Sequence, residues 1–73
     1  MDELERLKVL IEHWTEHNRE HAQTYKEWAE KAEAMGRKDI ATVLNSLSHE
    51  AGRLENLFIE ALSLVKVKGQ QTG

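Results

Sequence analysis

The chain has 73 residues, a formal net charge of −3 and no cysteine. A chain of this length forms one small domain at most, and without cysteine it has neither a disulfide nor a thiolate-bound metal. Residues 1–36 carry nine acidic residues against five Lys/Arg, which argues against nucleic acid or an anionic membrane as a partner.

No segment approaches the roughly 18 apolar residues that would span a bilayer. The acidic N-terminus is also unlike a secretory signal peptide. The expected location is therefore cytoplasmic.

The first predicted element is a helix over residues 2–35. One stripe of residues recurs there at alternating intervals of three and four, which is typical of a helix packed along one side. Acidic residues at its start and Gly36 just after its end suit helix termini. The predicted stripe, whose aromatic residues we expect in the core, consists of Leu4, Leu7, Ile11, Trp14, Asn18, His21, Tyr25, Trp28, Ala32 and Met35.

The second predicted element is a helix over residues 38–67, with Asp39 placed to cap or charge its first turn. Its predicted stripe consists of Ile40, Leu44, Leu47, Ala51, Leu54, Phe58, Ala61 and Val65. The connection is short, so the two helices must run antiparallel. The prediction is an all-α helical hairpin in one domain, residues 1–68, followed by a patternless, disordered tail over 69–73.

Both helices carry more apolar residues than one stripe accounts for. The additional residues are Leu10, Ala22, Ala29, Val43, Leu57, Leu62 and Leu64, and Ile59 points elsewhere again. Two helices cannot bury stripes this wide against each other, whereas four can. We therefore expect a homodimer that forms a four-helix bundle.

Three histidines follow one another at intervals of four residues on the first helix: His13, His17 and His21. Residues four apart are neighbours on a helix, so two imidazoles can bind one ion between them. This histidine ladder, His13, His17 and His21, predicts a site for nickel, zinc or cobalt. His17 and His21 are the expected primary ligands, and His13 is an entry ligand. Glu50 of the second helix is the expected completing ligand, with His49 and Glu55 as weaker candidates.

Other interpretations of the ladder stay open. His21 and Asn18 can form a polar core layer that fixes register without any metal, and carboxylates near histidines can make a pH-responsive patch. The hairpin would then be a structural module that offers its acidic first helix to a protein partner. The Glu-x-x-His motif of di-iron bundles is absent, as are a nucleophile with its base and a phosphate-binding loop, so we expect no enzyme activity.

The run His-Trp-x-x-His-Asn-x-x-His-Ala, continued by Tyr25 and Trp28, resembles a small His-rich helical domain of archaeal and bacterial proteins that is associated with nickel or cobalt handling. The resemblance covers about residues 10–35. It implies that the three histidines act together and that the unit works beside a metalloprotein maturation system. It does not indicate which ion is bound.

Overall fold

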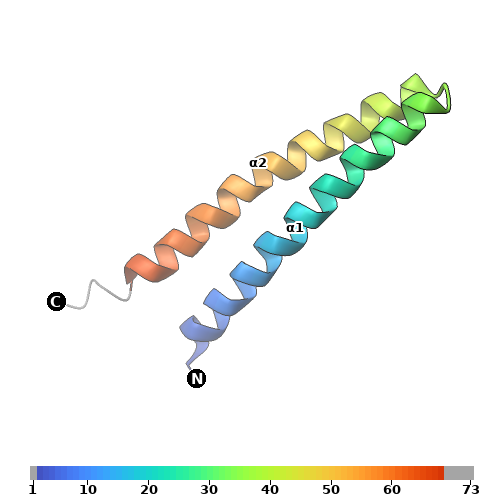
Figure 1. The fold of residues 1–73 in the computed structure, drawn as a ribbon. Helices are drawn as coiled ribbons and strands as arrows, with labels where there is room; N and C mark the ends of the chain where they lie inside the picture. Colours follow the sequence, from blue (N-terminus) through green and yellow to red (C-terminus); the bar gives the residue numbers. More distant parts are fainter. Residues whose placement is uncertain (1, 69–73) are drawn as a thin grey trace.

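The computed structural model describes residues 2–68, which form two antiparallel helices joined by a tight turn (Figure 1). Helix α1 spans Glu3–Ala34 and helix α2 spans Lys38–Lys68. The predicted hairpin is confirmed, with each helix end within one residue of its expected position. The tail predicted to be disordered, residues 69–73, lies outside the described residues.

Helix α1 begins at an acidic cap. The side chain of Asp2 accepts a hydrogen bond from the backbone N–H of Glu5 at 2.8 Å, which satisfies one of the free donors of the first turn. Glu3 and Glu5 add negative charge where the helix dipole favours it.

The turn is set by Gly36, whose φ of 80° is left-handed. The N–H of Gly36 donates to the Glu33 carbonyl and the N–H of Arg37 donates to the Ala32 carbonyl, both at 2.9 Å. This pair of bonds is the Schellman motif that ends many helices. The carbonyl of Arg37 then accepts the first bond of α2, from Ala41 at 3.0 Å, so the chain reverses within a few residues.

The contact between the helices is made by one stripe of residues on each helix, which we call the inner stripe. Every residue in it is buried or half-buried. On α1 it comprises Lys8, Ile11, Thr15, Asn18, Ala22, Tyr25, Ala29 and Ala32; on α2 it comprises Ala41, Leu44, Ser48, Ala51, Glu55, Phe58, Leu62 and Val65.

The predicted stripes are half right. Every second predicted residue, such as Ile11 or Ala51, lies in the inner stripe. Most of the others come one position before the residue that actually makes the contact. Trp14 and Trp28, expected in the core, are 44% and 50% exposed, and the buried residues are Thr15 and Ala29 instead. Small side chains let helix axes approach closely, and a large indole between them would hold the axes apart.

Two side chains connect the helices by hydrogen bonds to backbone carbonyls. The Asn18 amide donates to the Ala51 carbonyl at 2.7 Å, and the Ser48 hydroxyl donates to the Ala22 carbonyl at 3.0 Å. A serine side chain is short, so this second bond requires the two backbones to be close. The bonds also fix which levels of the helices face each other: residues 18–22 of α1 lie beside residues 48–51 of α2.

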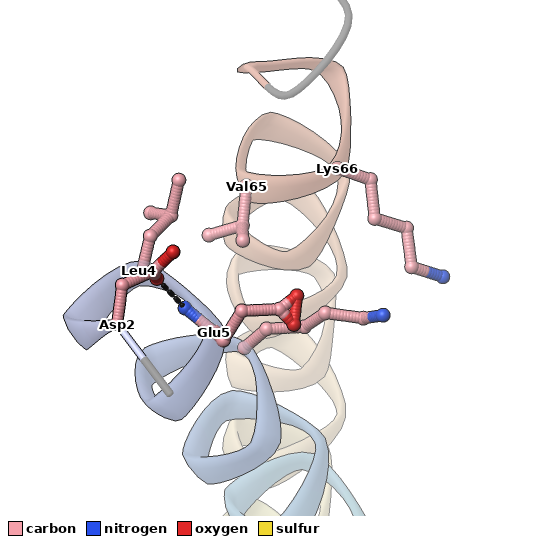
Figure 2. A pocket seen from close by; sticks show the side chains of 6 residues that line it. Asp2, Leu4, Glu5, Val65 and Lys66 are labelled. Carbon is pink, nitrogen blue, oxygen red and sulfur yellow. Dashed lines mark hydrogen bonds between the residues drawn. The ribbon is translucent and has the colours of Figure 1, made fainter.

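The hairpin is a rod rather than a globule, with extents of 59 × 19 × 11 Å and a radius of gyration of 16.8 Å. A compact chain of this length has a radius of gyration of about 11 Å. The helices lie further apart at the end away from the turn (Figure 1). There, Leu4 and Glu5 of α1 lie across a pocket of about 340 Å³ from Val65 and Lys66 of α2 (Figure 2).

Candidate functional site

The three histidines of α1 form a continuous column of rings. The ring centroids of His13 and His17 are 5.8 Å apart in an edge-on arrangement, and those of His17 and His21 are 4.6 Å apart with a tilt of 31°. Tyr25 continues the column, nearly parallel to His21 at 6.0 Å. The four-residue spacing therefore does bring neighbouring imidazoles together, as the sequence predicts.

The column does not lie between the two helices. All three histidines are exposed, and the position beside α2 that was expected for His21 belongs to Ala22. His17 and His21 each come one residue before an inner-stripe residue, so they lie on the flank of α1. The interpretation of His21 and Asn18 as one polar core layer is therefore wrong for the single hairpin, because Asn18 alone faces α2.

Glu50 lies at the same level of the hairpin as His21. Along the helix axes, both residues lie between the hydrogen bond of Asn18 to Ala51 and that of Ser48 to Ala22. Glu50 is exposed, and its carboxylate is 3.5 Å from Arg53. Within residues 2–68, no group of three His, Cys, Asp or Glu side chains is placed to hold a metal ion.

The two weaker candidate ligands lie elsewhere. Glu55 is half-buried and forms an ion pair with Arg19 across the hairpin, at 2.6 Å. His49 follows an inner-stripe residue, whereas His21 precedes one, so the two histidines lie on opposite sides. Neither candidate joins the histidine column in the single chain.

Most of the exposed large apolar residues of the described chain lie on one side of the hairpin, which we call the apolar face. Its members, all more than a third exposed, are Leu7, Leu10, Trp14, Trp28 and Met35 of α1, and Ile40, Val43, Leu47, Leu54, Leu57 and Leu64 of α2. Each precedes an inner-stripe residue by one position, except Met35, which continues the row seven residues after Trp28.

The one-residue offset places both rows on the same side. A step of one residue rotates a side chain by about 100° around its helix. The rotation has the same sense on both helices, and the helices run antiparallel, so both rows turn toward the same side of the hairpin. The residues that follow the inner stripe turn to the other side, and they are almost all polar; Val9 and Ile59 are the large apolar exceptions.

The apolar face is interrupted by few polar residues. On α1 these are His17, His21, Thr24 and Lys31, and on α2 the interruption is Glu50. The Lys31 ammonium lies 4.3 Å from the centre of the Trp28 ring, as a cation–π contact. Two of the three histidines and the one carboxylate thus share the side of the molecule that carries the large apolar residues, a placement that the predicted stripes did not give.

The fold and the site define a two-sided helical hairpin with an exposed apolar face. The chain belongs to the family described as Domain of unknown function (DUF8180), whose model matches residues 7–65. Neither the curated proteins nor the solved structures include one that matches the chain. Over the described residues, neither helix is long and apolar enough to cross a membrane.

Proposed function

We propose that the protein is a self-assembling helical module, in which two copies pack their apolar faces together and form a four-helix bundle. The observation that carries the proposal is the gathering of the large exposed apolar residues on one face. Soluble monomers rarely expose apolar patches that run along a whole molecule, and such patches mark interaction surfaces.

The accessible surface area of the chain is larger than a compact monomer of the same mass would have. The accessible surface is 5777 Å², whereas a compact monomer of 8.4 kDa exposes about 4,600 Å². The chain therefore exposes more surface than a compact monomer of its mass.

The charges of the apolar face favour a second copy as the partner. The row on α1 carries the cationic Lys31, while the row on α2 carries the anionic Glu50. The face therefore holds groups of both signs and can complement itself under two-fold symmetry. A different protein with an apolar helical surface is the alternative partner.

Two isomeric residues provide a matched test of the dimer. Leu54 on the apolar face is 48% exposed, and Ile59 outside it is 46% exposed. We expect Leu54→Glu to convert the dimer to a monomer, because it would bury unpaired charge between the copies, and Ile59→Glu to leave the dimer intact. Light scattering after gel filtration measures both. Equal behaviour of the two variants would contradict the proposal.

A second candidate function is the binding of nickel, zinc or cobalt by the histidine column. The 4.6 Å approach of His17 and His21 on one exposed flank favours it. An ion that binds only the folded chain raises the melting temperature by mass action. We expect the rise to be lost in a His17→Ala/His21→Ala double variant and kept in His49→Ala; an unchanged rise in the double variant would contradict metal binding at this column.

A further inference from the structure

We infer that metal binding strengthens dimerisation: a divalent transition-metal ion lies at the centre of the four-helix bundle, bound by His21 and Glu50 of both copies. The inference rests on the proposed homodimer. It adds that the site is incomplete in one chain and is completed by the second copy.

His21 and Glu50 lie close to each other along the hairpin and on the same side of it. His21 precedes Ala22 and Glu50 precedes Ala51, and both of these alanines accept a cross-helix hydrogen bond. His21 and Glu50 therefore share one level and one side of the hairpin. On the same side, Leu47 and Leu54 lie one turn from Glu50 on α2, and His17 and Thr24 lie one turn from His21 on α1.

The symmetry of a dimer brings the two pairs together. A two-fold axis between face-to-face hairpins can run parallel to the helices, and each residue then lies at the same height as its copy. The axis can instead run across the helices, and heights are then inverted about the axis. The large residues of α1 are spaced evenly about His21, at Leu7 and Trp14 on one side and Trp28 and Met35 on the other. In either arrangement, packing these rows in register places both His21–Glu50 pairs in one layer.

The chemistry of that layer suits a zinc-like ion. Two imidazole nitrogens and two carboxylate oxygens are ligands that zinc accepts in a four-coordinate site. Without a cation, the dimer would bury two carboxylates in an apolar interface, which is costly. A divalent cation neutralises both charges and binds both imidazoles, so the ion removes the main electrostatic cost of association.

The other two histidines have lesser roles in this site. The ring of His17 lies 4.6 Å from that of His21, tilted by 31°. His13, which the sequence suggested as an entry ligand, lies one further turn from the layer. In this site both are supporting residues rather than ligands.

The test uses metal-stripped, tag-free protein and zinc chloride as the probe. Native mass spectrometry gives the stoichiometry, and sedimentation equilibrium gives the dimer dissociation constant with and without zinc. We expect one ion per dimer and a dimer that tightens when zinc is added, because binding and association are thermodynamically linked. His21→Ala and Glu50→Gln should each weaken zinc binding by at least about 100-fold, more than loss of a supporting partner costs, whereas His49→Ala should bind as the unmodified chain does.

The outcomes separate the two proposals. A dimer that binds one ion per chain, or whose dissociation constant ignores zinc, overturns the shared site and leaves the homodimer standing. A dimer in which Glu50→Gln binds zinc normally also overturns it. A chain that stays monomeric with and without zinc overturns the homodimer, and the shared site with it.

Discussion

The two glycines of the described chain have opposite roles. Gly36 has a φ of 80°, and a Cβ atom added there would meet no other atom within 4 Å, so backbone strain alone would oppose a side chain. Gly52 also has open space around it, but it lies inside α2 with ordinary helical geometry. Glycine is needed at the first position and only weakens the helix at the second.

Alanine substitutions at these glycines should therefore change stability in opposite directions. Gly36→Ala should lower the free energy of unfolding by about 1 kcal/mol, because L-residues disfavour the left-handed region. Gly52→Ala should raise it by about 0.5–1 kcal/mol, because alanine is the better helix former. Urea unfolding monitored by circular dichroism measures both, and effects of the same sign would contradict this account of the turn.

Asp39 is the residue whose ionisation is most clearly set by its neighbours. Arg37 donates two hydrogen bonds to its carboxylate, at 3.2 and 3.1 Å, and the Ile40 N–H donates a third at 2.8 Å. The guanidinium first, and then the backbone N–H, lower the pKa of Asp39 below its ordinary value of 3.8. The carboxylate contributes its full stabilisation at pH values above 3.8, the ordinary pKa of the unfolded chain. The stabilisation is lost as the pH falls through the lowered pKa of the folded chain.

The effect of Arg37 on Asp39 can be measured directly. Arg37→Ala should raise the pKa of Asp39 toward its ordinary value, and the loss of stability that Asp39 contributes at acid pH should become smaller. Carboxyl NMR titration measures the pKa, with Arg53→Ala as a control that leaves it unchanged. An Asp39 pKa that does not respond to loss of Arg37 would contradict the assigned cause.

The most deeply buried positions between the two helices are taken mainly by small side chains. Ala29, Ala32, Ala41 and Ala51 are all at least 95% buried, and polar side chains reach the opposite backbone between them. Most of the large apolar residues that stay exposed lie on the flank, where they suit a contact with a third and a fourth helix.

A larger residue in the inner stripe should therefore be harmful even though it is apolar. Ala29 is 1% exposed, so Ala29→Leu should lower the free energy of unfolding by about 1–3 kcal/mol through overpacking. The neighbouring Trp28→Leu retains an apolar residue on the outer face and should cost the hairpin itself less. Thermal unfolding distinguishes these effects, and a stabilising Ala29→Leu would contradict the close approach of the helices.

The sequence predicted the fold well because helix ends and turns are encoded locally. Asp2, Gly36 and the three-four spacing are sufficient to place both helices within one residue. The rotation of the helices was half wrong because, at many positions, the residue before the close contact is more apolar than the residue that makes the contact. Leu7, Trp14 and Trp28 are more hydrophobic than Lys8, Thr15 and Ala29, and periodicity alone does not show that the close contact takes the smaller set.

The candidate site was predicted only in part for the same reason. The four-residue spacing of His13, His17 and His21 is a local property, and the column of rings follows from it. The side of the hairpin that His21 occupies depends on helix rotation, so it was assigned to the wrong surface. Its level on α2 depends on the antiparallel pairing: His21 was expected beside Ala51 to Leu54, whereas the next residue, Ala22, is bonded to Ser48.

At the scale of the whole molecule, the hairpin has a polar side and an apolar side that continues over its length. Its rod shape leaves the apolar side without an internal partner. The family match over residues 7–65 covers nearly the whole hairpin, so the two-helix unit is the element to which the homodimer proposal applies.

The measurement that tests the central claim most directly is sedimentation equilibrium of the unmodified, metal-stripped chain at micromolar concentration. The account predicts a folded, helical species of twice the chain mass of 8.4 kDa, dissociating only on dilution. A folded, cooperative species of 8.4 kDa throughout this range would contradict it, because the apolar face would then be stable in water without a second copy.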